Sequence, residues 1–379
     1  MALAGIITFL NMYSIQAVLP LIAASFAVPP AAAGLTITAT TSAVAIVAPL
    51  VGSVSDMLGR KRLIVAAIWG LVAPTLMVGL AGSLAAMLIW RFVQGLLLPF
   101  IFAVTIAYIA DETSDAETIR LAGTYSSGTI FAGFFGRFLA GWSAEWFGWR
   151  AAFFVLAGCT LLAALAVGVL LPRERRFRPV RGWHATYQGF AEHLRNPRLL
   201  GTCAVGFSVL FVIVAAFTYA NFLLAAPPFR LGPAGLGSIF VVYLAGMVAT
   251  PLATRLAVRV GRRATLAGAT VTGVAGLALT LLVSLPAIVV GLALFAAAAF
   301  VAGALAIGYI GVAARRAKST AVGLYVMVYY IGGSLGGVAP AGLWHRFGWP
   351  GCVGLCALVL VAMLLAALAT WREAAGQPA

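Results

Sequence analysis

The sequence predicts an all-α integral membrane protein with twelve transmembrane helices in two pseudo-symmetric six-helix bundles. Three observations lead to this fold class: the composition, the spacing of the long uncharged stretches, and a repeat between the two halves. Of the 379 residues, 63% are hydrophobic and 9% are charged, whereas about a quarter of an average soluble domain is charged. One soluble core would not bury so much apolar surface, so the lipid bilayer is the expected solvent.

Twelve stretches of the chain are long enough to span a bilayer, which takes roughly 20 apolar residues. Pro29 and Pro30 divide the first long uncharged stretch, and Pro286 divides a later one. The expected spans are 2–26, 33–54, 63–82, 84–109, 120–143, 149–171, 199–224, 234–256, 264–283, 287–310, 320–343 and 349–370. They define an N-terminal bundle (1–171), a cytoplasmic linker (172–198) and a C-terminal bundle (199–379).

The positive charges predict the orientation of these spans. Of the 24 Lys and Arg residues, 19 fall in the C-terminal tail and in the loops on its side, and only three fall on the opposite side. Both termini are therefore expected in the cytoplasm, with the chain in the inner (plasma) membrane. A net charge of +15 would suit a nucleic-acid partner, but the charges are confined to short loops, so this class is excluded.

The linker carries a second pattern. After a run of arginines, Trp183, Tyr187, Phe190 and Leu194 recur at helical spacing. This spacing predicts an amphipathic helix on the cytoplasmic membrane face. Such a helix either anchors the linker to anionic lipid or docks a partner.

The two halves repeat each other. At a constant offset of 200, seven residues recur: Gly123, Tyr125, Gly133, Gly136, Phe147, Gly148 and Trp149 match Gly323, Tyr325, Gly333, Gly336, Phe347, Gly348 and Trp349. Two similar bundles joined by a linker can expose a central site to each side in turn by rocking. Channels usually build a symmetric pore from several subunits, so a monomeric carrier is expected here.

Two motifs resemble a known family. The segment from Gly52 to Arg62, with Asp56 and Gly59-Arg60-Lys61, fits G-x-x-x-D-x-x-G-R-[KR], the loop 2–3 signature of the major facilitator superfamily. The run from Arg91 to Gly95 is similar to the R-x-x-Q-G motif of its proton-linked efflux branches. The segment from Tyr13 to Pro20 resembles the first span of bacterial inner-membrane permeases for arabinose or drug efflux.

The resemblance implies a secondary active transporter that moves a small organic solute by alternating access. The leading expectation is efflux coupled to protons, and the alternative is a sugar or organic-acid importer or facilitator without proton antiport. No enzyme activity, cofactor or metal is expected. The cytoplasmic segments carry no phosphate-binding glycine loop, and the three histidines and four cysteines form no metal-ligand or catalytic pattern.

The resemblance also implies a gate at loop 2–3. Its expected residues are Gly52, Asp56, Gly59, Arg60 and Lys61, with Asp111 or Glu112 at the end of span four as the acid that pairs with the loop arginine. Asp56 is expected to accept from a helix N-terminus in the other bundle, and this latch would stabilise the outward-facing state. Alternatively, Arg60, Lys61 and Arg62 only enforce topology.

Two arginines lie inside spans, where a charge costs roughly 2.5–3.5 kcal/mol on insertion scales. Arg91, followed by Gln94 and Gly95, is expected to bind an anionic substrate group or to tune a proton site. The alternative is a structural arginine satisfied by backbone carbonyls. Arg137 stands where drug–proton antiporters commonly carry proline in G-x-x-x-G-P-x-x-G-G.

The rest of the span-five motif consists of glycines. Gly133, Arg137 and Gly141 share a helix face, and Gly136 lies beside them. This stripe either takes part in coupling or allows close helix packing.

Six residues are candidates for the substrate cavity because they lie on spans one, seven and ten: Asn11, Tyr13, Gln16, Tyr219, Asn221 and Tyr309. With a buried arginine they favour an amphiphilic or weakly anionic solute; alternatively, the aromatic residues only pack or anchor. No Asp, Glu or His lies in the middle of a span, so the buried titrating carboxylate of many proton-coupled carriers is missing. Proton coupling would then use Asp111 or Glu145, at span ends.

Overall fold

The computed structural model describes residues 1–113, 115–172, 174, 192–314 and 316–371. All regular elements in these ranges are α- or 3-10 helices. Ten helices of this part of the chain are long and apolar enough to cross a membrane. The predicted all-helical membrane fold is confirmed. The predicted linker helix falls mainly on 175–191, outside the described residues.

The chain divides into two compact units. Unit 1 comprises Met1–Trp183 and Leu224–Phe240, and unit 2 comprises His184–Leu223 and Val241–Ala379. The sequence placed 224–240 with the C-terminal bundle, whereas here it groups with unit 1. The reason is a close approach of two glycines, because a Cβ on Gly141 would lie 3.0 Å from the Cα of Gly237. The backbones of these two segments therefore pack without side chains between them.

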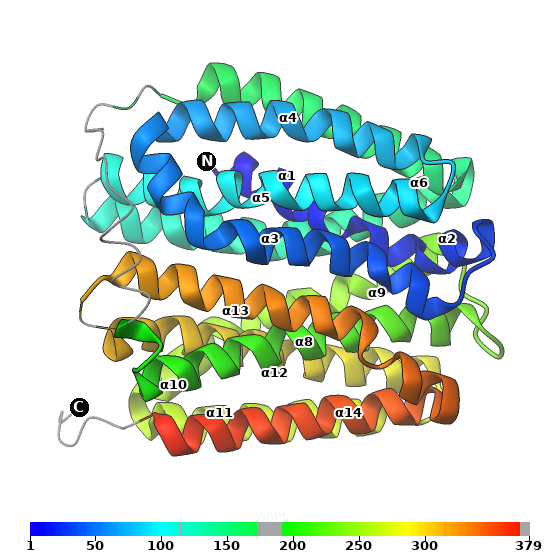
Figure 1. Ribbon diagram of the computed structural model, residues 1–379. Helices are drawn as coiled ribbons and strands as arrows, with labels where there is room; N and C mark the ends of the chain where they lie inside the picture. The colour runs from blue at the N-terminus through cyan, green and yellow to red at the C-terminus, as the bar shows by residue number, and fades with distance from the viewer. Residues whose placement is uncertain (114, 173, 175–191, 315, 372–379) are drawn as a thin grey trace. The chain divides into compact units, whose positions relative to one another are not determined.

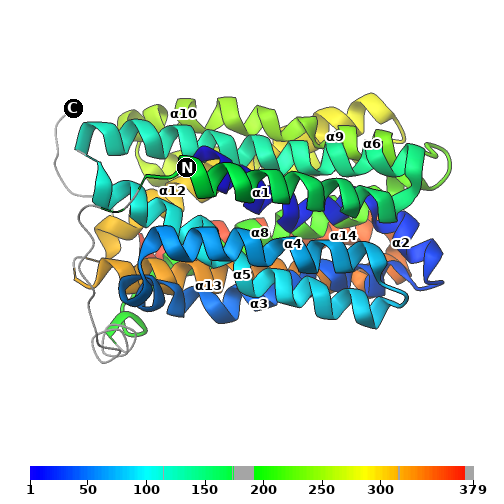
Figure 2. The same cartoon turned by 90° about the horizontal axis from the view of Figure 1, so that it is seen from above.

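Unit 1 is a bundle of long helices around the first span. Its elements are α1 (Ala2–Tyr13), the 3-10 helix η1 (Ser14–Val18), α2 (Leu19–Ser25), α3 (Pro30–Leu58), α4 (Arg60–Leu80), α5 (Leu84–Glu112), α6 (Asp115–Leu170) and the short α9 (Pro233–Ile239). The helices α3 and α4 both pack against α5, and α1 packs against α6. Figures 1 and 2 show α3, α4 and α5 side by side from two directions.

Unit 2 repeats this plan. Its elements are α8 (Pro197–Ala225), the 3-10 helix η2 (Phe240–Val242), α10 (Tyr243–Val260), α11 (Arg262–Leu279), α12 (Leu285–Ala313), α13 (Lys318–Val338) and α14 (Ala341–Thr370). The helices α10 and α11 pack against α12, and α11 also packs against α14.

Several predicted boundaries differ from the structure. The expected span 2–26 is interrupted by η1, and Pro20, which has no N–H, lies in the first turn of the new helix α2, where proline is tolerated. The expected span 234–256 is likewise divided into α9, η2 and α10. Spans five and six, by contrast, agree with the prediction: they are two helices that meet in a kink at Gly148, with φ of 80°, and are together labelled α6 (Asp115–Leu170).

The repeat between the halves is visible in the backbone. Gly59 and Gly261 both have φ of 90°, and Gly348 has φ of 61° where Gly148 has 80°. Each pair stands at the same helix junction of its own unit.

A second repeated feature is a tyrosine ring packed on a glycine. A Cβ on Gly5 would lie 2.6 Å from the ring of Tyr125, and a Cβ on Gly206 would lie 2.5 Å from the ring of Tyr325. The two units therefore share packing details as well as sequence.

Candidate functional site

Three charged side chains, from α3, α4 and α5, meet beside the turn between α3 and α4. Gly59 makes the turn with φ of 90° and ψ of 139°, a conformation that favours glycine. The turn places Arg60 in the first turn of α4, where its Nη2 lies 2.7 Å from Oδ2 of Asp111 and 3.5 Å from Oδ1 of Asp56. The structure thus brings together residues from α3, α4 and α5. Of the two acids expected at the end of α5, Asp111 contacts Arg60.

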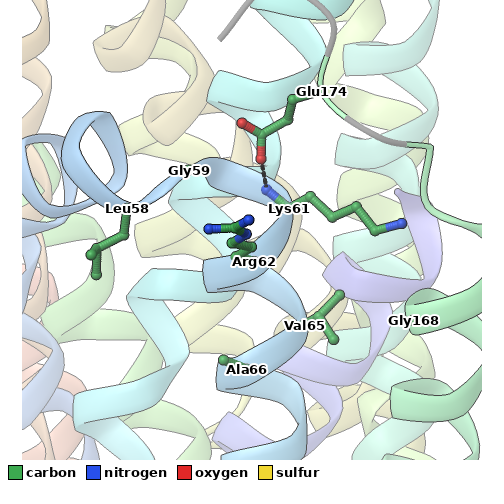
Figure 3. A pocket seen from close by; sticks show the side chains of 8 residues that line it. All are labelled: Leu58, Gly59, Lys61, Arg62, Val65, Ala66, Gly168 and Glu174. Atoms are coloured by element: carbon green, nitrogen blue, oxygen red, sulfur yellow. Dashed lines mark hydrogen bonds between the residues drawn. The ribbon is translucent and has the colours of Figure 1, made fainter. Parts of the chain in front are cut away.

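The other residues of this motif have different surroundings. The backbone N–H of Lys61 donates to Glu174, and its ammonium donates to the carbonyl of Leu171. These contacts border a cavity of about 1000 Å³, in which Glu174 lies over the first turn of α4 (Figure 3). A Cβ on Gly52 would meet nothing within 4 Å, so packing does not explain the glycine there.

Arg91 lies at the centre of a buried network in unit 1. Its side chain is 0% exposed, and all three of its nitrogens donate. Nη1 donates to the carbonyl of Asn11 (3.0 Å) and to Oε1 of Gln94 (2.7 Å), and Nη2 donates to the carbonyl of Met12 (2.6 Å). Nε donates to the carbonyl of Thr36 at 3.3 Å. No carboxylate of the described residues lies within 4.0 Å of this guanidinium.

The network extends from Gln94 through two further helices. Nε2 of Gln94 donates to Oγ1 of Thr75 (2.8 Å), and this hydroxyl lies 2.9 Å from Oδ1 of Asn11. Nδ2 of Asn11 donates to Oγ1 of Thr160 at 2.9 Å. Asn11, expected in the substrate cavity, instead joins helices within unit 1.

These contacts match the alternative named for Arg91 in the sequence analysis, a structural arginine whose charge is satisfied by backbone carbonyls. Sequence reasoning missed Thr36, whose carbonyl accepts from Arg91, and also Thr75 and Thr160, whose hydroxyls extend the network through Gln94 and Asn11. Their mid-span position was the available signal, but a threonine hydroxyl is usually satisfied by its own helix and does not interrupt an apolar stretch.

Arg137 forms a second cluster, with two residues of the expected cavity. Its Nε donates to Oε1 of Gln16 at 2.8 Å, and its Nη1 donates to the carbonyl of Gly133. The guanidinium carbon lies 4.9 Å from the ring centre of Tyr13 and 4.5 Å from that of Phe240. The side chain is 2% exposed. The cluster is a desolvated cation between two aromatic rings.

This second cluster lies where the first span is not α-helical. Gln16 belongs to η1, and Tyr13 is the last residue of α1. Interrupted membrane helices form the binding sites of many secondary transporters, because their free backbone and side chains line a cavity. Phe240, missed from the sequence, joins through the segment 224–240.

The three cavity candidates of unit 2 do not converge. The ring of Tyr219 packs at a tilt of 49° against that of Trp344, with ring centres 5.4 Å apart. Asn221 donates to the carbonyl of Phe217, one turn earlier in α8. Tyr309 stacks on Trp371 at 4.8 Å, which makes it a packing residue near the end of α14.

The motif glycines serve close packing. A Cβ on Gly136 would lie 2.8 Å from the Cα of Leu10, and Gly141 approaches Gly237 as described above. A Cβ on Gly95 would lie 2.7 Å from that of Ala43 and would also collide with the carbonyl of Thr40. Gly95, Gly136 and Gly141 thus allow neighbouring helices to approach closely.

We expect Gly95→Ala to destabilise unit 1 by roughly 1–3 kcal/mol, because an added methyl group overpacks the contact between α3 and α5. The measurement is the melting midpoint of the purified protein in detergent. Gly52→Ala is the matched control, since its methyl group enters open space. Equal melting midpoints for the two variants would contradict the packing role of Gly95.

No group of three or more His, Cys, Asp or Glu side chains within the described residues is placed to hold a metal ion. All four cysteines are free thiols.

Comparison with known proteins gives consistent matches. A family profile described as Major Facilitator Superfamily matches residues 1–236. The inner membrane transport protein YnfM of Escherichia coli (strain K12) is 33% identical over 363 residues, covering 96% of this chain and 87% of that protein. The MFS-type transporter YybF of Bacillus subtilis (strain 168) is 29% identical over 363 residues, covering 95% and 90%. The crystal structure of the nucleoside transporter NupG aligns with a TM-score of 0.75 at 14% identity, covering 98% of this chain and 99% of that chain, which shows the shared fold.

Proposed function

Because this chain belongs to the Major Facilitator Superfamily and is a multi-pass membrane transporter, we propose that it exports a small organic solute by alternating access in exchange for protons. In this proposal the chain works as a monomer in the inner membrane with both termini in the cytoplasm. The strong bias of its positive charges supports that orientation.

The observation that carries the proposal is the Arg137 cluster. The guanidinium is held by the amide oxygen of Gln16 and by the rings of Tyr13 and Phe240. A carboxylate accepts a stronger, charge-assisted hydrogen bond than an amide does, so an anionic solute group can replace Gln16 as the partner of Arg137. The two rings suit an apolar or aromatic body. The substrate class proposed is therefore an amphiphilic, weakly anionic organic compound.

Arg91 is not the substrate ligand in this proposal. Its nitrogens already donate to three carbonyls and to Gln94. An incoming anion would have to break bonds that join α1, α3 and α5.

A second candidate function is an importer or facilitator of a sugar or organic acid without proton antiport. The observation that favours it is the sequence itself, which has no Asp, Glu or His in the middle of a predicted span. A carrier that loads and unloads a proton near neutral pH commonly uses such a group.

A pH-gradient assay distinguishes the two candidates. Everted vesicles containing the protein are energised and then given amphiphilic organic acids, cationic drugs or sugars. We expect organic acids to dissipate the gradient. In an everted vesicle the exporter moves solute into the lumen and releases protons from it in exchange. If no compound does so, yet a labelled sugar or organic acid equilibrates through the protein, the uncoupled candidate replaces the proposal.

We expect Arg137→Gln to weaken the response to organic acids about tenfold or more, because a charge-assisted hydrogen bond contributes roughly 1.5–3 kcal/mol. Arg62→Gln is the matched control, since it removes the same charge from an exposed position of unit 1. An undiminished response of Arg137→Gln, with normal insertion, would exclude Arg137 as the anion ligand.

A further inference from the structure

Unit 2 contains a second polar cavity, of about 370 Å³, that has no part in the transport site proposed above. One wall comes from the chain just before and at the start of α8, and the other comes from the end of α12 and the residues that follow it. The positive-inside bias assigns this end of unit 2 to the cytoplasm.

Two side chains fix the distance between these walls. Nδ2 of Asn196 donates to the carbonyl of Ala313 at 2.7 Å, and Nε2 of His193 lies 3.1 Å from the carbonyl of Ala317. Oδ1 of Asn196 also accepts from the N–H groups of Arg198 and Leu199, at 3.1 and 3.3 Å. The cavity is therefore built by hydrogen bonds between segments more than 100 residues apart.

Three arginines line this cavity with one carboxylate. Arg195 and Arg198 come from the first wall and Arg316 from the second, and Glu192 is the acid. In the part of the chain that the structure describes, no carboxylate oxygen lies within 4.0 Å of any of these guanidinium groups. Among the residues that the structure describes, the lining thus has an excess of positive charge that no ion pair neutralises. Arginine is well suited to phosphate because its planar fork donates two parallel hydrogen bonds.

The two segments that line the cavity expose apolar side chains, here called its rim. Val312 lines the cavity and is 43% exposed, and Leu194 and Leu200, which are close in the sequence to lining residues, are 57% and 40% exposed. Exposed apolar side chains beside a basic cavity at the membrane surface match a ligand with a charged headgroup and hydrocarbon chains. Inorganic phosphate has no hydrocarbon part that could pack on these apolar side chains.

We propose that this cavity binds the phosphate headgroup of an anionic glycerophospholipid from the cytoplasmic leaflet. Arg195, Arg198 and Arg316 contact the phosphate, and the acyl chains lie on the apolar rim. The bound lipid bridges the start of α8 and the segment after α12, as Asn196 and His193 do. The site is independent of the solute that the protein carries.

Lipid binding to the purified full-length chain tests this proposal. The protein in a neutral detergent is titrated with phosphatidylglycerol, and the first binding constant is read by native mass spectrometry. Phosphatidylcholine is the neutral reference, and inorganic phosphate is the soluble competitor. We expect phosphatidylglycerol to bind at least about tenfold more tightly than phosphatidylcholine, since basic residues near a membrane surface each favour anionic lipid.

A matched pair of double variants locates the site. Arg195→Gln/Arg316→Gln is expected to weaken the first phosphatidylglycerol constant about tenfold. Arg255→Gln/Arg259→Gln removes the same charge from exposed positions at the end of α10, and we expect less than about a twofold change there. Equal effects of the two pairs, or no effect of the first, would overturn the proposal. Displacement of the lipid by millimolar phosphate would also overturn it, because the ligand would then be a free anion.

Discussion

Replacing Arg91 by leucine is expected to destabilise unit 1 by about 3 kcal/mol rather than to change which solutes are transported. The substitution removes the donor that Arg91 supplies to the carbonyls of Asn11 and Met12, while the carbonyl of Thr36 still accepts from the hydroxyl of Thr40. A buried acceptor left unpaired costs roughly 1–3 kcal/mol, although such terms are often smaller in membranes. The leucine variant no longer has to bury the charge of Arg91, and this gain in folding free energy offsets part of the loss.

The position of these carbonyls explains why Arg91 is needed. Asn11 and Met12 lie at the end of α1, just before η1. The last carbonyls of a helix have no partner in that helix, and a cation there is favourable. In a bilayer no water satisfies them, so Arg91 supplies the donors.

The measurement is the melting midpoint, together with the yield of folded protein in detergent. Arg150→Leu is the control, because this exposed arginine of unit 1 also donates to a carbonyl, that of Ala81, without a buried network. Arg91→Lys is expected to lie in between, since one ammonium cannot reach all four acceptors. A stable Arg91→Leu protein that had lost only anion transport would restore the substrate-binding role.

The sequence predicted the membrane fold well because the bilayer imposes a simple rule. Every spanning backbone group must be satisfied internally, so long apolar stretches become helices. The glycine pair Gly148 and Gly348 was found from the repeat, and the structure shows the positive φ of both residues. Such local patterns can be recognised from the sequence alone.

Contacts between residues far apart in the sequence could not be predicted. The sequence singled out Arg91 as a charge but could not show that the end of α1 presents the carbonyls of Asn11 and Met12 to it. Gln16 and Arg137 were both candidates, yet their contact depends on how α1 ends against α6. The glycine contact that draws 224–240 into unit 1 involves Gly141 and Gly237, which are 96 positions apart in the sequence.

Removing the ion pair at loop 2–3 is expected to impair transport with little effect on stability. Arg60 and Asp111 are partly exposed, at 14% and 48%, and an exposed ion pair contributes roughly 0.2–1 kcal/mol. The melting midpoints of Arg60→Gln and Asp111→Asn should therefore stay close to that of the parent. Transport should fall by up to about fivefold in each, because an ion pair that contributes at most about 1 kcal/mol biases the equilibrium between conformations by no more than that.

A double-mutant cycle separates this latch from a role in topology alone. If Arg60 and Asp111 act as one unit, the Arg60→Gln/Asp111→Asn protein should be no worse than either single variant, because coupled residues are not additive. Asp56→Asn should have a smaller effect, since its oxygen is 3.5 Å from Arg60 against 2.7 Å for Asp111. Lys61→Gln is the control, because it removes a neighbouring charge that has a different partner.

Hydrogen exchange at the start of α4 gives a readout that requires no known substrate. Loss of the pair should free the first turn of α4 and speed exchange of its amides in Arg60→Gln and Asp111→Asn alike. In the alternative, Arg60 and Lys61 act only through their positive charge. Lys61→Gln should then speed amide exchange at the start of α4 as much as Arg60→Gln does. Unchanged exchange and transport in Asp111→Asn would leave Arg60 with the topological role alone, because its carboxylate partner would be dispensable.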